Sequence, residues 1–426
     1  MEKKNRKLQT PRGTSDILPD DQVYWEWVKK IAIETASIFG HSRIDTPMFE
    51  DTSLFLRTVG EGTDIVEKEM YTFQDRGKDS LTLRPEGTAP VARAYIEHGM
   101  HSLPQPVKFY YITPIFRYER PQAGRFRQHW QFGIETIGDD SSQLDSEVIH
   151  LLWTFLLKTG ISGIRLLINS IGDDNCRPEY LRLLKSHYET KLDDLCAECK
   201  IRFNKNPLRL LDCKQEGCQL TKATSPKILD YLCHECETHF ERVKETLTLW
   251  NIPYTVTPEL VRGLDYYTKT VFEIHPGSEG SQTALGAGGR YDGLIEKIGG
   301  KPTPAVGFGS GIERIILTLK SLNFIPEEQK LSKDSIYIAY IGIPAYEKML
   351  SVINHLRNSG ITVYASTKPR SLKAQLRSAN NSSAARTLII GEDELSSNKG
   401  KLLDMQSNIT TEIPLDNLVE LLTLNT

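Results

Sequence analysis

The chain has 426 residues, which is enough for two or three domains of about 150 residues each. Hydrophobic residues make up 39% and charged residues 25%, so a fibrous or largely disordered protein is excluded. The 52 Lys+Arg and 55 Asp+Glu give a formal net charge of −3, which excludes nucleic-acid binding by bulk charge but not by a local basic groove. Six of the seven cysteines lie between Cys196 and Cys236, and such a local cluster favours a reducing compartment over a secreted disulfide scaffold.

Neither a signal peptide nor a membrane segment is expected. The basic N-terminus leads into Pro11, Gly13 and Asp16 instead of an apolar stretch. No part of the sequence approaches the roughly 18 apolar residues that a membrane helix needs. We therefore predict a cytoplasmic protein that has no membrane partner.

Hydrophobic periodicity and turn residues predict an α+β fold for the first part of the chain. The expected elements are a helix from Pro19 to Gly40, short strands at 43–50 and 81–84, a helix after Pro85, strands at 108–119 and 128–138 joined by a polar loop, and a core helix at 146–158. Helices and strands do not alternate strictly here, which indicates an antiparallel sheet flanked by helices.

The rest of the sequence divides into an insertion, a linker and a second domain. Residues 177–250 are helical, charged and rich in cysteine, and we interpret them as an insertion within a first domain of residues 1–325. Strands at 270–275 and 305–308 and a helix at 311–320 follow it. A polar linker at 326–335 precedes residues 336–426, where strands and helices alternate as in a small α/β domain.

The predicted hairpin carries a polar face and an apolar face. Alternation gives Gln131, Gly133 and Glu135 one face of the second strand, while Trp130, Phe132 and Ile134 take the other. The apolar face is expected in the core. The polar face is either solvated or a binding surface, on which Gly133 leaves room for a ligand.

Two segments concentrate basic residues. Arg117, Arg120, Arg125 and Arg127 lie within eleven residues around the hairpin loop, and guanidinium groups suit bidentate binding of phosphate. Residues 366–386 hold five basic residues and no acid, which fits either a nucleic-acid contact or a solvated helix face.

Two glycine-rich segments, residues 285–292 and 307–314, are expected to form turns where backbone approaches a ligand. The second leads from a strand into a helix and puts Arg314 near the helix N-terminus, which favours an anion. Neither matches the dinucleotide fingerprint or the P-loop.

Together these motifs resemble those of a known family. Arg117-Tyr118-Glu119 is similar to motif 2 of class II aminoacyl-tRNA synthetases, the 309–314 segment to motif 3, and residues 43–50 to motif 1, which forms the dimer interface in that class. Residues 260–267 and 287–292 resemble two peptides particular to histidyl-tRNA synthetases, and residues 83–88 and 371–376 also fit. The resemblance implies a class II catalytic domain with an antiparallel sheet, a C-terminal anticodon-binding domain and a homodimer. It implies ligation of L-histidine to tRNA(His) through histidyl-adenylate, with ATP as substrate and Mg²⁺.

The resemblance also implies a role for individual residues. Arg117 would bind the α-phosphate and Arg314 the γ-phosphate of ATP, with Glu119 near the adenine, while Arg262 and Arg117 would be catalytic. The implied histidine site is Glu86, Gly87, Thr88, Gln131, Glu135, Tyr266 and Tyr267. The implied tRNA contacts are Arg120, Gln122 and Arg127 at the acceptor end and Lys368, Arg370 and Lys373 at the anticodon.

One departure from the family pattern follows Arg127-Gln128, where His129-Trp130 replaces the usual Phe followed by His or Tyr. Trp130 still falls on the apolar face. We expect His129 to be a loop-edge residue without a catalytic task.

The cysteines suggest a structural metal. Cys196, Cys199, Cys233 and Cys236 form two CxxC pairs, whose spacing is typical of a tetrahedral zinc site. The alternative is a set of buried thiols in a small helical module.

Two other functions remain open. A non-catalytic histidine-binding regulatory paralogue of an ATP phosphoribosyltransferase would keep the histidine pocket but lose the residues for ATP and tRNA. Here Arg117, Arg262 and Arg314 are all present, as is the terminal α/β domain. A class II synthetase for another amino acid, such as proline or threonine, is disfavoured by residues 262–267 and by Glu86.

Overall fold

The computed structural model describes residues 8–60, 63–119, 124–277, 284–326, 335–382, 384–416, 418 and 420. The chain forms two compact units, Met1–Ile325 and Pro326–Thr426. Within the described ranges, no helix is both long enough and apolar enough to cross a membrane.

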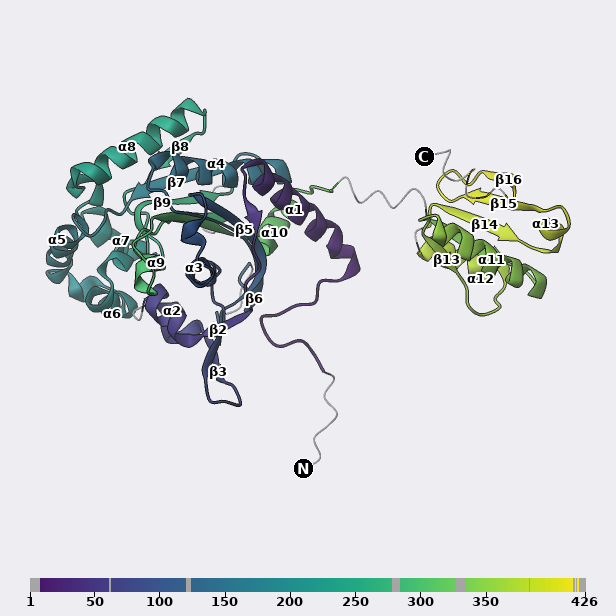
Figure 1. Ribbon diagram of the computed structural model, residues 1–426, viewed down its shortest axis with the longest axis horizontal. Coiled ribbons are helices and arrows are strands. Elements are labelled where there is room, and N and C mark those ends of the chain that lie inside the picture. Colours follow the sequence, from purple (N-terminus) through teal and green to yellow (C-terminus); the bar gives the residue numbers. More distant parts are fainter. Residues whose placement is uncertain are drawn as a thin grey trace. The chain divides into compact units, whose positions relative to one another are not determined.

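An eight-stranded sheet forms the centre of the first unit (Figure 1). Its strand order is β1 (Ser42–Arg43), β5 (Val107–Phe116), β6 (Gln128–Ile137), β11 (Ala305–Gly311), β10 (Gly286–Arg290), β9 (Thr268–His275), β7 (Arg165–Ser170) and β8 (Tyr254–Val256). All pairs from β5 to β7 are antiparallel, and only the edge strands β1 and β8 pair in parallel. The predicted α+β class and the hairpin at 108–138 are thus confirmed.

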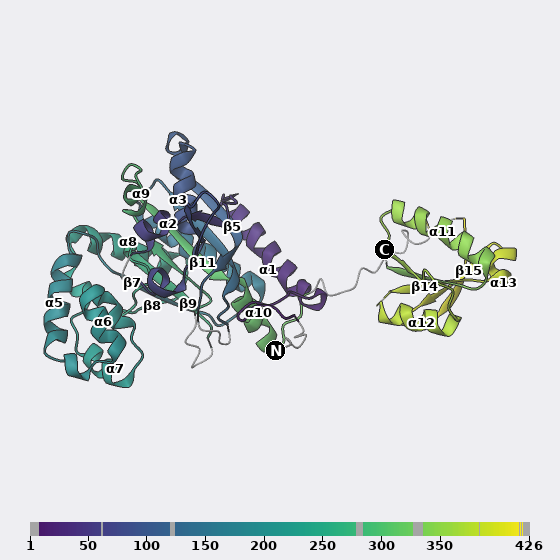
Figure 2. The same ribbon diagram turned by 90° about the horizontal axis from the view of Figure 1, so that it is seen from below.

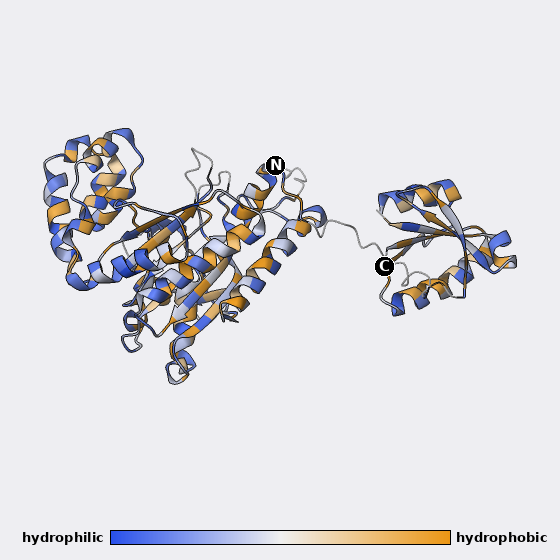
Figure 3. Ribbon diagram, turned by 90° about the horizontal axis from the view of Figure 1, so that it is seen from above, coloured by the Kyte–Doolittle hydropathy of each residue, from blue (hydrophilic) through white to orange (hydrophobic). Residues whose placement is uncertain are grey.

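The two faces of the sheet bury different cores, as the two-residue period of a strand requires. One face packs Phe132, Ile134 and Phe272 against a set of helices. These helices are α1 (Pro19–Ile38), α4 (Ser142–Thr159), α8 (His234–Leu249) and α10 (Ile312–Ser321). Figure 3 colours the helices with both hydrophobic and hydrophilic residues, as expected for helices with one buried face. The opposite face carries Tyr111 and Val271 and packs against α3 (Thr88–Glu97) and the insertion.

The predicted strand at 43–50 is split between two sheets. Its first part is β1, and its end is β2 (Phe49–Asp51), which joins β4 (Ser80–Leu83) and β3 (Tyr71–Gln74) in a small separate sheet. Pro47 interrupts the ladder because proline has no N–H to donate. The buried Arg84 guanidinium holds the break by donating to the carbonyls of Thr46 (2.8 Å) and Pro47 (3.1 Å). Helix α2 (Thr52–Val59) follows directly.

The cysteine-bearing insertion is a helical lobe of α5 (Arg177–Glu189), α6 (Ala197–Lys205) and α7 (Glu216–Ala223), which group at one end of the first unit (Figure 2). Its last helix, α8, returns along the sheet and packs on α4. The lobe has its own buried side chains, including Tyr180, Leu184 and Tyr188, and they are continuous with the core beneath Tyr266 and Tyr267.

Both glycine-rich segments contain strands where the sequence predicts turns: residues 286–290 form one strand, and residues 307–311 are the end of β11, directly before α10. Gly286–Arg290 is β10 in the middle of the sheet, between β9 and β11. A Cβ at Gly288 would lie 2.1 Å from the carbonyl oxygen of Gly307, so only glycine allows the two strands to approach.

The second unit has a five-stranded sheet in the order β13 (Val363–Ala365), β12 (Ile336–Tyr340), β14 (Arg386–Ile390), β15 (Lys399–Asp404) and β16 (Thr410–Pro414). The first three are parallel and the last two antiparallel. Its helices are α11 (Ile343–Asn358), α12 (Leu372–Asn381) and α13 (Glu392–Ser396). Most of the predicted linker at 326–335 lies outside the described residues.

Candidate active site

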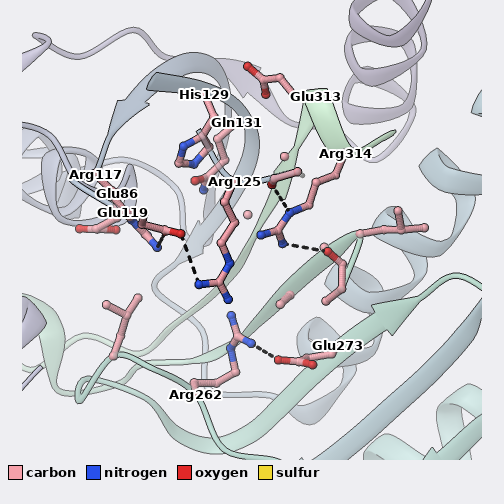
Figure 4. A pocket seen from close by; sticks show the side chains of 18 of the residues that line it. Glu86, Arg117, Glu119, Arg125, His129, Gln131, Arg262, Glu273, Glu313 and Arg314 are labelled. Atoms are coloured by element: carbon pink, nitrogen blue, oxygen red, sulfur yellow. Dashed lines mark hydrogen bonds and ion pairs between the residues drawn. The ribbon is translucent and has the colours of Figure 1, made fainter. Parts of the chain in front are cut away.

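A cavity of about 460 Å³ opens on the polar face of the sheet (Figure 4). Its walls come from the β5–β6 hairpin, the strands β9 to β11, the start of α3 and the insertion. The residues implied by the sequence that line this cavity are Glu86, Thr88, Arg117, Glu119, Gln131, Arg262, Tyr266, Tyr267 and Arg314. Side chains separated by more than 200 residues in the sequence therefore face one space.

Two arginines of this cavity flank the carboxylate of Glu119, and a third arginine, Arg314, lines the same cavity. Arg117 and Arg125 lie 3.9 and 3.6 Å from the carboxylate of Glu119, and Arg117 also donates to the carbonyl of Pro85 at 2.6 Å. Arg314 donates to the carbonyls of Gly124 (3.1 Å) and Ala284 (3.2 Å). Burial and the neighbouring Arg125 lower the pKa of Arg314. This end of the cavity has an excess of cations over acids and suits a polyphosphate.

Arg262 lines the same cavity and pairs with Glu273 (Figure 4). Glu273 also accepts a hydrogen bond from His275 at 2.8 Å. Burial alone would raise the pKa of Glu273, but the hydrogen bond from His275 and the charge of Arg262 outweigh it and lower the pKa. Glu273 and His275 were not singled out from the sequence. Their position on β9 beside a functional arginine is set only by the fold.

Two buried carboxyl groups form the floor of the cavity: Glu86 lines it, and Glu135 lies one layer deeper, behind the lining residue Thr88. Glu86 accepts hydrogen bonds from the backbone N–H groups of Thr88 (2.6 Å) and Ala89 (2.8 Å) at the start of α3, although burial still raises its pKa. Glu135 is completely buried and accepts hydrogen bonds from the hydroxyls of Thr88 (2.9 Å), Tyr111 (3.0 Å) and Tyr291. Burial raises the pKa of Glu135 to about 8, because these hydrogen bonds only partly offset desolvation.

Tyr111 occupies the space that the sequence assigned to a ligand at Gly133. A Cβ at Gly133 would lie 2.1 Å from the Tyr111 ring, and a Cβ at Gly87 would lie 2.4 Å from it. The two glycines thus admit a tyrosine and not a substrate. The Tyr111 hydroxyl joins Glu135 to Gln131, whose amide donates to it at 3.3 Å. Tyr111 lies directly opposite Gly133 in the hairpin, so the register of the two strands could have predicted that the tyrosine fills this space.

His129 is a wall residue of the cavity and not the loop-edge residue expected from the sequence. It lies within β6, two residues before Gln131 and on the same face. Burial, with the charges of Arg117 and Arg314, lowers the pKa of His129 to about 3, so the imidazole is neutral at physiological pH. Strand β6 begins at Gln128, as predicted, and Gln128 pairs with Phe116 of β5, so His129 belongs to the paired strand and not to the loop.

Of the residues implied for tRNA binding, those that the structure describes do not line this cavity. The Arg127 guanidinium stacks on the exposed Tyr118 ring at 3.7 Å from the ring centre. Lys368, Arg370 and Lys373 are exposed at the start of α12 in the second unit. Arg120 and Gln122 lie outside the described residues.

The structure does not bring the two CxxC pairs together. Cys196 and Cys199 lie with Cys213 and Cys218, whereas Cys233 and Cys236 lie with Cys176 and Asp173. The reason is helix packing: α6 lies against the 3-10 helix η4 (Pro207–Asp212), while the start of α8 meets the start of α5. The four-ligand set expected from the sequence is therefore replaced by two separate clusters.

Comparison with known proteins places this cavity in a family. The family model described as histidyl-tRNA synthetase matches residues 13–315, and the one described as anticodon binding domain matches residues 335–424. A histidine–tRNA ligase of Dehalococcoides mccartyi is 52% identical over 411 residues, which are 96% of this chain and 98% of that protein. The chain belongs to the histidyl-tRNA synthetase family. A histidine–tRNA ligase of Caldanaerobacter subterraneus is 48% identical over 96% of this chain and 98% of its own length.

Solved structures agree with this assignment. The histidyl-tRNA synthetase of S. aureus without ligands has a TM-score of 0.82 and 37% identity, and it covers 97% of this chain and 99% of its own. A Bacillus halodurans protein described as an ATP phosphoribosyltransferase regulatory subunit/histidyl-tRNA synthetase shares the fold at 20% identity and a TM-score of 0.64, over 91% of this chain and 98% of its own. The curated relatives are ligases over nearly the full chain, so the regulatory alternative is not favoured.

Proposed function

We propose that the protein uses ATP to activate L-histidine and transfers the histidyl group to tRNA(His). The observation that carries this proposal is that Arg117, Arg262 and Arg314 line the same cavity as Glu86 and Gln131. A site with three cations and a polar amino-acid pocket suits a reaction between a triphosphate and a carboxylate. A regulatory histidine-binding protein would have no need for the three arginines.

The first step is an in-line displacement at the α-phosphorus of ATP. A carboxylate oxygen of histidine forms a bond to phosphorus while the bond to pyrophosphate breaks, so that histidyl-adenylate and pyrophosphate result. Arg117 binds the α-phosphate, Arg314 the γ-phosphate, and Arg262 stabilises the charge on the α-phosphoryl group. No group of the protein has to form a covalent bond, so positioning and electrostatic stabilisation supply the rate. The ion pair with Glu273 holds Arg262 at its position.

The second step transfers the histidyl group. A terminal ribose hydroxyl of the tRNA attacks the histidyl carbonyl, the proton of the hydroxyl is released, and AMP leaves. We propose Arg127, Arg120 and Gln122 as contacts to the acceptor end, and Lys368, Arg370 and Lys373 as contacts to the anticodon. The exposure of the last three side chains supports this assignment.

Histidine recognition is assigned to the carboxyl floor and to two tyrosines. Glu86, Thr88 and Gln131, next to Gly87, bind the α-ammonium group. Tyr266 and Tyr267 recognise the imidazole, which offers two nitrogens for hydrogen bonds. Glu135 contributes by orienting the hydroxyls of Thr88, Tyr111 and Tyr291, which donate to it. An amino acid without those nitrogens would leave buried polar groups unpaired and be rejected.

A divalent ion accompanies ATP in this family, and we propose Mg²⁺. Magnesium prefers oxygen ligands and commonly takes one or two carboxylates together with substrate phosphates. The carboxylates of Glu119 and Glu273 line the cavity and fit that requirement. When bound, the ion would neutralise charge on the phosphates.

We further propose that the protein is a cytoplasmic homodimer. The small sheet exposes Phe49 and Phe73, which are 50% and 43% exposed and pack edge to face with 6.3 Å between ring centres. Exposed aromatic pairs of this kind mark protein interfaces. All seven cysteines are free thiols, as a reducing compartment favours. Light scattering should give the mass of two chains, and Phe73→Lys should lower it toward one; the matched change Leu249→Lys, on an exposed leucine of α8, should not.

The deciding experiment is ATP–pyrophosphate exchange measured with each of the twenty amino acids. The proposal predicts exchange with histidine alone. Histidine binding without exchange would support the regulatory alternative, and exchange with another amino acid would assign the chain to a different specificity.

A further inference from the structure

The cysteines of the insertion, together with Cys176 directly before it, occupy one repeated structural position. Cys176, Cys196 and Cys233 are the residues that immediately precede helices α5, α6 and α8. Cys199, Cys218 and Cys236 are the third residues of α6, α7 and α8. Six of the seven thiols therefore lie at helix N-termini, where the first N–H groups of the helix have no partner within the helix and can donate to sulfur.

The first group, which we call the four-cysteine cluster, consists of Cys196, Cys199, Cys213 and Cys218. All of its sulfur atoms lie within 4.8 Å of one another. The Sγ atoms of Cys196 and Cys213 are 3.9 Å apart, and the Cys218 sulfur accepts the N–H of Cys196 at 3.3 Å. Four sulfurs about 2.3 Å from a tetrahedral zinc ion would be about 3.8 Å apart, whereas a disulfide requires about 2.05 Å.

The second group, which we call the aspartate–cysteine cluster, consists of Asp173, Cys176, Cys233 and Cys236. Its ligand atoms also lie within 4.8 Å of one another. One carboxylate oxygen of Asp173 is 3.6 Å from the Cys176 sulfur and 3.9 Å from the Cys233 sulfur. The carboxylate of Asp173 is the fourth ligand of this cluster. The four-cysteine cluster holds four of the seven cysteines of the chain, and the aspartate–cysteine cluster holds the other three.

We propose that the insertion binds two structural zinc ions, one in the four-cysteine cluster and one in the aspartate–cysteine cluster. Thiolates with one carboxylate at tetrahedral spacing select zinc over magnesium or calcium, which prefer oxygen ligands. Four protein ligands leave no open position, so neither ion would be catalytic. Buried thiols without a metal would have no reason to converge in two separate groups of four ligands.

Each cluster supports one wall of the cavity. Asp212 and Lys214 line the cavity on either side of Cys213 in the sequence, so a metal in the four-cysteine cluster would hold that wall. Arg177 follows Cys176 and donates to the carbonyls of Gly172 and Tyr267, both at 2.8 Å. Tyr267 is itself a wall residue. This part of the inference, unlike the metal content, rests on the proposed function of the cavity.

The test is the zinc content of the full-length protein after dialysis against a metal-chelating resin, measured by elemental analysis. We expect two zinc ions per chain. Cys213→Ser and Cys236→Ser should each leave about one, and the double variant should leave about none. The matched control Ser225→Ala, in the same lobe but outside both clusters, should keep two. A value well below one in the parent would overturn the proposal. A parent with one zinc ion, lost completely in either single variant, would also overturn it, because that result means a single shared site.

Two further measurements do not depend on variants that fold. A mercurial reagent titrated into the parent protein should release two zinc ions as it modifies seven thiols, and thiols that react without release of metal would refute both sites. Cobalt reconstitution should give the strong sulfur-to-metal charge-transfer band of tetrahedral thiolate sites. Because metal content is measured without substrates, its failure and a failure of histidine-dependent exchange are distinguishable. If Cys213→Ser lost its zinc yet kept the Michaelis constants for histidine and ATP, the support of the cavity wall would be refuted.

Discussion

The Glu135→Gln substitution is the sharpest test of how the floor of the cavity recognises histidine. The side chain keeps its size, but one of its two acceptor oxygens becomes an NH₂ donor and the negative charge cannot form. Three hydroxyls donate to Glu135 in the structure, from Thr88, Tyr111 and Tyr291. At least one of these hydroxyls must lose its acceptor in the variant.

The size of the effect depends on pH. The pKa of Glu135 is about 8 because of burial, so the parent carboxyl is almost fully protonated at pH 6 and mostly ionised at pH 9. A hydrogen bond to a charged group contributes about 1.5–3 kcal/mol and one between neutral groups about 0.5–1.5 kcal/mol. With a factor of ten for each 1.4 kcal/mol, kcat/KM for histidine should fall roughly 10- to 100-fold at pH 9 and about 2- to 10-fold at pH 6.

The assay is histidine-dependent ATP–pyrophosphate exchange, with kcat/KM of the parent divided by that of the variant at each pH. The ratio cancels the ionisation of histidine itself, and kcat/KM reports groups of the free enzyme. The ratio should rise with a midpoint near pH 8, while the Michaelis constant for ATP stays unchanged. Glu147→Gln makes the same chemical change on α4, where Glu147 pairs with Lys108, and should give a flat ratio near one. A ratio for Glu135→Gln that is flat or near one at pH 9 would refute the reasoning.

The same raised pKa makes a prediction for folding. The folded protein holds the proton of Glu135 more tightly than the unfolded chain, whose carboxyl titrates at about 4.5. The stabilising contribution is therefore complete below pH 4.5 and is lost as pH rises through 8. Relative to the parent, Glu135→Gln should be more resistant to urea at pH 9 than at pH 5, and no change in the difference between these pH values would contradict the raised pKa.

Three other substitutions test separate parts of the molecule. Arg262→Ala should lower kcat of exchange by about 10²- to 10³-fold, which is the usual effect of removing one group that stabilises a transition state. Histidine affinity, measured by calorimetry, should change little. Near-normal exchange would exclude a catalytic role for Arg262. Asp145→Asn should lower the free energy of unfolding in urea by about 3–5 kcal/mol because it removes the buried charge that faces Arg290 and leaves that guanidinium with only the partly exposed Asp292 as an ionic partner. Burial would raise the pKa of Asp145, but the charge of Arg290 outweighs it and lowers the pKa to about 2. The stability that the ionised Asp145 contributes is therefore present above pH 4 and is lost as pH falls through 2. An equal loss of unfolding free energy in the variant at pH 7 and at pH 2 would contradict this. Lys373→Ala should weaken tRNA binding and reduce the slope of log affinity against log salt by roughly 1, with exchange unchanged, whereas an unaltered slope would exclude a phosphate contact.

Local patterns in the sequence predict the hairpin well. The alternation of Trp130, Phe132 and Ile134 assigns the core face correctly, since Phe132 and Ile134 are completely buried. The predicted strands differ from β5 and β6 by three residues or fewer at each end, because the apolar run determines the buried part of a strand and leaves its ends open. The split at Pro47 was also present as a sequence signal, although which sheet each half joins depends on distant strands.

The cavity is less predictable because its walls come from side chains that meet only through long-range packing. Glycine at position 133 was expected to leave room for a ligand, but a tyrosine from the facing strand enters that room. Glu273 carries no motif that distinguishes it from other polar strand residues, and the unusual His129 gave no indication that it lines the cavity. Their effect on Arg262 and on the phosphate end of the cavity becomes visible only when β6 and β9 are placed in one sheet.

The cysteines show the limit of spacing arguments most clearly. A CxxC pair followed by a helix is a local feature, because the first cysteine precedes the helix and the second is its third residue, so both thiols face the same helix N-terminus. Which other ligands complete the set is decided by how helices dock, and here α6 meets η4 and α7 while α8 meets α5. Asp173 precedes the insertion and has no cysteine motif, so only the fold can assign it as the fourth ligand. Cys199→Ser and Cys233→Ser should each lower the zinc content by one ion per chain, and only the double variant should contain none. This result would show that helix docking, and not the spacing of the CxxC pairs, determines which residues share a zinc ion.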